Sequence, residues 1–151
     1  MVNLEGKTVL VVGAGRGIGR RAAELFSETD ANIVISSRSE PELAELKYKL
    51  NTHGNQNILA LAADASLETD VRALVDESVK KFGSIDYLVQ AAGMGVFKPF
   101  SDITAADFDN LLNANVRTAF NVLQAVLPQM AAQKFGRVVA IPGNFGKAPM
   151  M

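Results

Sequence analysis

The sequence predicts an α/β protein in which helices cover both faces of a doubly wound parallel sheet. Short, nearly continuous apolar runs alternate with longer segments of helical periodicity. Strands covered on both faces show such runs rather than an alternating pattern. No linker or low-complexity stretch divides the 151 residues, which is the length of one compact domain. We therefore expect a single domain over residues 1–151.

Five strands are expected, one for each apolar run. They extend from Thr8 to Val12, Asn32 to Ser36, Ile58 to Ala62, Tyr87 to Ala91 and Arg137 to Ile141.

A capping pattern marks the helix after the second strand. Ser39 is followed by Glu42, with Pro41 in the first turn, which is typical of a capping box. Gly54 can end this helix in a left-handed conformation. The apolar face expected in the core consists of Leu43, Leu46 and Leu50.

Two further helices follow. Ser66 is predicted to open the first, which ends at Gly83. Thr104 with Asp107 starts a longer helix that runs to about Ala132. Apolar side chains recur at helical spacing in both, and we expect them in the core. They are Val71, Leu74, Val75 and Val79 in the first helix, and Phe108, Leu111, Leu112, Val116, Phe120, Leu123 and Leu127 in the second.

The stretch "VVGAGRGIGR" places four glycines between the first strand and the first helix. Glycine allows backbone angles and close approaches that a side chain would block. N–H groups at the start of the helix can then face a pyrophosphate. This context predicts a Rossmann-type dinucleotide-binding turn; the alternative is a tight turn that only packs helix against sheet. Its predicted cofactor-binding residues are Gly13, Gly15, Arg16, Gly17, Ile18 and Gly19.

The end of the second strand indicates which dinucleotide is preferred. Sites for NAD usually carry an acidic residue there, whereas this sequence has Ser37 and Arg38. Arg38 can form charge-assisted hydrogen bonds with a 2′-phosphate, and Arg16 can approach the same group. NADP(H) is therefore predicted in preference to NAD(H). The alternative for both arginines is a solvated surface position.

With these motifs in place, the sequence resembles the classical short-chain dehydrogenase/reductase family along its whole length. The family signature Thr-Gly-x-x-x-Gly-x-Gly corresponds to residues 12–19, with Val12 in place of threonine. The resemblance implies that Asp64, followed by Ala65, meets the adenine; the alternative for Asp64 is a helix cap. The family's Asn-Asn-Ala-Gly corresponds to Gln90-Ala91-Ala92-Gly93, whose small Ala92-Gly93 pair would admit the cofactor ribose.

The resemblance also implies catalytic groups, and the sequence carries only part of them. "NANVRTAF" resembles the segment with the family's active-site asparagine, which corresponds to Asn115 and helps to organise a proton relay. The family serine after the fifth strand corresponds to Gly143. Neither Tyr48 nor Tyr87 is followed by lysine four residues later, so the Tyr-x-x-x-Lys motif is absent. An acid/base group contributes about 10²- to 10⁴-fold, so only trace turnover is expected of this chain alone.

Three interpretations follow from this pattern. The first is the NADP(H)-binding portion of an oxidoreductase acting on a small carbonyl or alcohol substrate, cut before its catalytic helix. The second is a non-catalytic nucleotide-binding or assembly module that ends naturally at Met151, and the third is a full-length enzyme that uses other groups.

The resemblance carries structural expectations as well. It implies strand order 3-2-1-4-5, with the fifth strand as an apolar edge. We expect a homo-oligomer formed through this edge or through the helix over residues 104–132.

The composition argues against several other partners. A net charge of −1 gives no reason to expect nucleic acid or an anionic membrane surface. No apolar run approaches the roughly 20 residues that cross a bilayer, and a cytoplasmic location is expected. With no cysteine and His53 as the only histidine, neither a disulfide nor a metal site is expected.

Overall fold

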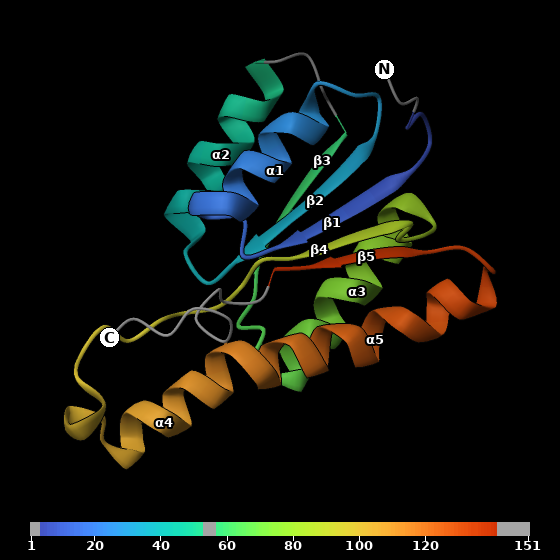
Figure 1. Ribbon diagram of the computed structural model, residues 1–151. Coiled ribbons are helices and arrows are strands. Elements are labelled where there is room, and N and C mark those ends of the chain that lie inside the picture. Colours follow the sequence, from blue (N-terminus) through green and yellow to red (C-terminus); the bar gives the residue numbers. More distant parts are fainter. Residues whose placement is uncertain (1–3, 53–56, 142–151) are drawn as a thin grey trace.

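The computed structural model describes residues 4–52 and 57–141 and contains the expected five-stranded parallel sheet (Figure 1). The strand order is β3-β2-β1-β4-β5, and every neighbouring pair is parallel. The fold class and the strand order are thus confirmed. The strands are β1 (Thr8–Val12), β2 (Asn32–Ser37), β3 (Ile58–Ala62), β4 (Tyr87–Gln90) and β5 (Arg137–Ala140).

Helices cover both faces of this sheet (Figure 1). On one face lie α1 (Gly17–Ser27) and α2 (Glu40–Thr52), and on the other lie α3 (Glu68–Phe82) and α5 (Thr118–Ala132). Alternate side chains of β1 point to opposite faces of the sheet. Val9 and Val11 belong to one buried cluster, and Leu10 and Val12 belong to the other. The central strand therefore connects two separate apolar cores.

The helix after β2 packs as its sequence predicts. Leu43, Leu46 and Leu50 are all buried, in the same cluster as Ile33 and Ile35 of β2. The predicted stop at Gly54, like His53, lies outside the described residues.

The predicted start of α3 at Ser66 is wrong. The helix begins at Glu68, and its N-cap is Leu67. Both the N–H and the hydroxyl of Ser66 donate to Asp64 Oδ1, at 2.9 and 2.7 Å. The carboxylate thus holds Ser66 in a local turn before the helix. At the other end Gly83, with φ +84°, caps the helix as predicted.

The long helical segment begins as predicted but turns a different face to the sheet. Thr104 and Asp107 form the full capping box of α4 (Ala105–Leu112). A π-helical turn over Asn113–Arg117 then joins α4 to α5. The stripe expected in the core is largely exposed, namely at Phe108, Leu112, Val116, Phe120 and Leu127. The buried residues of α5 are instead Thr118, Asn121, Val122, Val126 and Met130.

The physical reason for this error is that the segment carries apolar residues on more than one face. Periodicity identifies each face but does not show which one meets the sheet. Because α5 packs beside α3 on the same face of the sheet, the face of α5 that contains Val122 and Val126 is the one that is buried. At the neighbouring sheet edge, Val138 and Val139 of β5 are also exposed.

Within the described residues, no helix combines the length and apolar character that crossing a membrane requires.

Leu46 tests how strongly α2 is held to the sheet. Its side chain is fully buried, so we expect Leu46→Ala to lower the free energy of unfolding by about 2–5 kcal/mol through lost contacts and a cavity. Chemical denaturation measures this change. On the same helix Tyr48 is 75% exposed, and Tyr48→Ala should change stability by only about 0.5 kcal/mol or less. Equal losses in the two variants would contradict the burial of Leu46 against the sheet.

Candidate functional site

A cavity of about 570 Å³ opens at the carboxyl ends of β1 to β4. In doubly wound sheets this end is where ligands bind. The cavity brings together segments far apart in the sequence: the glycine turn, the ends of β2, β3 and β4, and the start of α5. Of the predicted site residues, it is lined by Gly13, Gly15, Arg16, Ser37, Arg38, Asp64, Ala65, Ala91, Ala92 and Gly93. Four others, Gly17, Ile18, Gly19 and Asn115, do not line it.

The glycine turn is pressed against the end of β4. Gly13 has φ +84°, and a Cβ atom there would lie 2.5 Å from the backbone nitrogen of Ala92. A Cβ atom on Gly19 would overlap the carbonyl oxygen of Gly13. Both positions therefore require glycine, one for its backbone angle and both for space. Gly17 also has a positive φ, +58°, but it faces open space.

The start of α1 has no side-chain cap. Its N-cap residue, Arg16, is extended, and the Arg16 side chain forms no capping hydrogen bond. The first N–H groups of a helix have no partner within the helix and carry positive partial charge. The N–H groups of Gly13 and Ala14 both donate to the carbonyl of Ser36, at 2.8 and 2.9 Å. Unlike the helix start, these two amides are already engaged in holding the turn against β2.

Two exposed arginines and a carboxylate surround the side of the cavity near β2 and β3. Arg38 follows β2, and Arg16 lies in the glycine turn. Burial by itself would raise the pKa of Asp64, but the two hydrogen bonds from Ser66 and the charge of Arg38 lower that pKa on balance. Asp64 is thus held ionised and oriented. Its expected alternative role, a helix cap, is not what the contacts of α3 show, because that N-cap has no side-chain hydrogen bond.

Glu42 is a cavity residue that sequence reasoning placed only in a helix cap. Ser39 Oγ accepts the N–H of Glu42 at 3.4 Å. The N–H of Ser39, however, donates to Ser37 Oγ at 3.3 Å instead of to the Glu42 carboxylate. Only half of the expected capping box therefore forms, and Glu42 lines the cavity. A carboxylate in the first turn of the helix after β2 was the available signal.

Asn115 acts on the segment that follows β4. Its Nδ2 donates to the carbonyls of Met94 and Leu111, both at 2.9 Å, and its Oδ1 accepts the Met94 N–H at 3.2 Å. A Cβ atom on Gly93 would lie 2.6 Å from Asn115 Oδ1. Gly93 thus admits the Asn115 amide, which in turn holds the backbone of Met94. Asn115 lies in the π-helical turn, a distortion that is frequent at functional sites.

Three buried polar residues support the cavity from behind. Asn121 Nδ2 donates to the carbonyls of Ala65 and Ser66, at 3.1 and 3.0 Å, and so connects α5 to the loop after β3. Gln90 Nε2 lies 3.4 Å from Thr118 Oγ1 and connects β4 to α5. The available signal for Asn121 was an amide side chain within a largely apolar helix. Gly143, the predicted counterpart of the family serine, lies outside the described residues.

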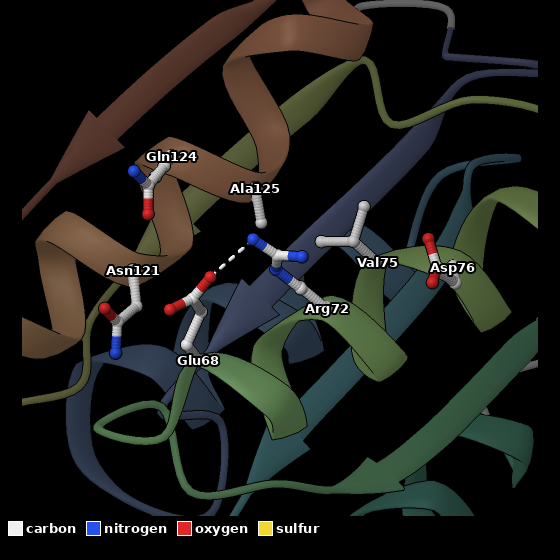
Figure 2. Close-up of a pocket in the computed structure, with 7 residues that line it drawn as sticks. All are labelled: Glu68, Arg72, Val75, Asp76, Asn121, Gln124 and Ala125. Atoms are coloured by element: carbon white, nitrogen blue, oxygen red, sulfur yellow. Dashed lines mark ion pairs between the residues drawn. The ribbon is translucent and has the colours of Figure 1, made fainter.

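A second cavity, of about 310 Å³, lies between α3 and α5 (Figure 2). Glu68 and Arg72 form an ion pair across one helical turn at 2.5 Å, and both side chains are mostly exposed. Asn121 borders this cavity, but its amide nitrogen is occupied by the two carbonyls named above. The lining is therefore explained by packing between two helices. The described residues contain no group of three or more His, Asp or Glu side chains suited to a metal ion.

Comparison with known proteins identifies the family. The sequence model of the short chain dehydrogenases matches residues 7–151. The chain belongs to this family.

Individual relatives of this short-chain dehydrogenase chain are moderately similar in sequence. Oxidoreductase UcpA of Escherichia coli (strain K12) is 37% identical over 146 residues, which cover 97% of this chain and 55% of that protein. The sepiapterin reductase of Chlorobaculum tepidum is 35% identical over 140 residues, which cover 88% and 57%. The chain thus spans about half the length of these curated relatives.

Solved structures of the family share the fold. The complex of 7α-hydroxysteroid dehydrogenase with NADH and 7-oxo glycochenodeoxycholic acid matches with a TM-score of 0.91 at 31% identity, covering 99% of this chain and 58% of that one. NAD⁺-bound xylitol dehydrogenase matches with a TM-score of 0.90 at 34% identity, covering 98% and 57%. The five-stranded core is therefore that of a Rossmann-type short-chain dehydrogenase.

The Asp64 turn makes the stability of this short-chain dehydrogenase chain depend on pH. Because the pKa of Asp64 is lower in the folded chain than its ordinary value, the ionised group stabilises the fold above that ordinary value. This contribution is lost as the pH falls through the lowered pKa. We expect Ser66→Ala to raise the pKa of Asp64, since one of the two hydrogen bonds from residue 66 is removed. An NMR titration of the carboxyl carbon measures the shift.

Ser84→Ala provides the matched control for this titration. The Ser84 hydroxyl donates to Asp86 rather than to Asp64, so its removal should leave the pKa of Asp64 in place. If Ser66→Ala leaves the Asp64 titration unchanged, the proposed role of the turn is wrong.

Proposed function

We propose that this chain is the NADP(H)-binding portion of a short-chain dehydrogenase/reductase that transfers hydride between nicotinamide and a small carbonyl or alcohol substrate. The observation that supports the proposal is the cavity beside the start of α1, where the glycine turn, Arg38, Asp64 and the Ala92–Gly93 pair come together. Two structural neighbours in complex with NADH and NAD⁺ support a nicotinamide dinucleotide as the ligand class.

The residues present fit such a cofactor. The uncapped N–H groups at the start of α1 suit the pyrophosphate. Gly13 and Gly93, on the wall of the same cavity, leave no room for a Cβ atom. Asp64 and Ala65 would meet the adenine, and the backbone of Ala92–Gly93 would admit a ribose. Bound there, the cofactor would supply the hydride. The preference for NADP(H) rests on Arg38 and Arg16, whose guanidinium groups can bind a 2′-phosphate.

We further propose that Asn115 is a positioning residue. Its amide holds the Met94 backbone through two hydrogen bonds, and Met94 lies on the wall of the cavity directly after Gly93. Asn115 would in this way orient the segment beside the nicotinamide. The 151 residues contain no Tyr-x-x-x-Lys, so this chain by itself should bind cofactor with at most trace turnover.

Charge reversal at Arg38 tests the cofactor assignment. Arg38→Asp should weaken NADPH binding much more than NADH binding, by about tenfold or more, because an attraction to the 2′-phosphate becomes a repulsion. Calorimetric titration of both cofactors measures this difference. The matched control is Arg72→Asp, since Arg72 lies in the second cavity and does not line the first. Equal losses for NADPH and NADH would contradict the role of Arg38, and no binding of either cofactor to the unchanged chain would contradict the proposed function.

We also propose that a second copy of the chain covers the exposed face of α4 and α5. This surface carries Phe108, Leu112, Val116 and Phe120, each at least 44% exposed. Apolar side chains gathered on one face are typical of protein interaction sites. The edge strand β5 also exposes two apolar side chains, Val138 and Val139.

Phe120→Asp should therefore reduce self-association. A charge introduced into a buried apolar contact carries a large desolvation penalty, so we expect a clear shift toward monomer in sedimentation velocity at several concentrations. Tyr48→Asp makes a comparable change at an exposed aromatic side chain on α2 and should leave the association unchanged. A chain that stays monomeric before any substitution, even at high concentration, would disprove this interface.

A further inference from the structure

Glu42 places a negative charge at the end of β2, where the sequence predicts only the positive charges of Arg38 and Arg16. Its carboxylate lies against Gly15: a Cβ atom on Gly15 would overlap Glu42 Oε2 and would lie 3.0 Å from Ser37 Oγ. Glu42, Gly15 and Ser37 all line the nucleotide cavity. The carboxylate therefore belongs to the part of the cavity between the glycine turn and the end of β2.

The fold leaves this carboxylate available to a ligand. In a complete capping box it would accept the N–H of Ser39, but Ser37 Oγ accepts that N–H instead. Within the part of the chain that the structure describes, the Glu42 carboxylate has no hydrogen-bond or ion-pair partner. Glu42 is half-buried, so its side chain is only partly exposed to solvent.

Groups of opposite charge line this side of the cavity. Arg16 and Arg38 line the same cavity as Glu42, and among the described residues neither arginine forms an ion pair. The remaining carboxylate that lines it, Asp64, already accepts two hydrogen bonds from Ser66. Of the two carboxylates, Glu42 is thus the one with neither oxygen engaged by the described residues.

The two cofactor forms would respond to Glu42 in opposite ways. The ribose of NAD(H) ends in a 2′-hydroxyl, which donates a hydrogen bond to an acidic residue at this end of the sheet. NADP(H) carries a 2′-phosphate there, which arginine attracts and a carboxylate repels. An arginine pair and a carboxylate beside one ribose therefore favour different cofactors.

We propose that Glu42 is a specificity-determining residue that opposes Arg38 and Arg16. Its carboxylate accepts a hydrogen bond from the 2′-hydroxyl of NAD(H) and repels the 2′-phosphate of NADP(H). The chain therefore binds both cofactors, and it prefers NADP(H) less strongly than the two arginines alone would make it. This inference rests on the proposed function of the cavity.

Glu42→Gln tests the proposal because it removes the charge and nearly preserves the size of the side chain. The first probes are adenosine 2′,5′-bisphosphate and adenosine 5′-monophosphate, which differ only at the 2′ position; NADPH and NADH follow. Calorimetry should show tighter binding of the 2′-phosphorylated ligands and weaker binding of the 2′-hydroxyl ligands. The ratio of the two dissociation constants should shift by about tenfold, as expected for a charge-assisted hydrogen bond and a lost repulsion.

Glu40→Gln is the matched control. Glu40 also lies in the first turn of α2 and loses the same charge, but it does not line the cavity. Its effect on the ratio should be small and should disappear at high salt, because the charge is solvent-exposed. Thermal unfolding of both variants checks that the fold is retained.

The outcomes separate the inference from the function on which it rests. If the chain binds both ligand classes and Glu42→Gln changes them equally, or no more than Glu40→Gln does, the specificity role is wrong while the cavity remains a nucleotide site. If the unchanged chain binds neither class, the proposed function fails and the inference fails with it.

Discussion

The closeness of the glycine turn to the end of β4 is the constraint on which the site depends. A Cβ atom on Gly13 would clash with the backbone of Ala91 and Ala92, and one on Gly19 would clash with the Gly13 carbonyl. With no Cβ atom between them, β1, β4 and the first turn of α1 meet backbone to backbone. Ser36 ties the same turn to β2 by accepting two N–H groups. The helix start is thereby aimed at the carboxyl ends of the strands, where a nucleotide cavity can form.

The same principle extends from β4 to the helical side of the cavity. Gly93 leaves room for the Asn115 amide, and that amide holds the Met94 backbone. Asn121 ties the loop after β3 to α5 through two carbonyls. Both amides hydrogen-bond to backbone groups of the adjoining loops, so they hold those loops in place. The cavity walls are therefore positioned by backbone contacts as much as by side chains.

Much of the fold could be predicted because parallel strands have a strong local signal. The five apolar runs match the observed strands to within one residue at each end. The starts of the helices were less certain, since their caps depend on competing hydrogen bonds. Thr104 and Asp107 formed the predicted capping box. Elsewhere, Asp64 accepts the N–H of Ser66, and Ser37 Oγ accepts the N–H of Ser39. In each failure a neighbouring side chain offered an alternative partner that the capping pattern alone does not reveal.

The sequence by itself determined the glycine turn and the arginine that follows β2, because these are properties of short contiguous segments. The strand order was implied by the family resemblance. Only the tertiary structure decided which face of the α4–α5 segment meets the sheet, since several faces are apolar and packing against α3 selects one. It also decided that the Glu42 carboxylate stands beside Gly15. That placement arises because α2 packs against the glycine turn. Gly15 and Glu42 are about 27 residues apart, and local sequence patterns do not report a contact over that separation.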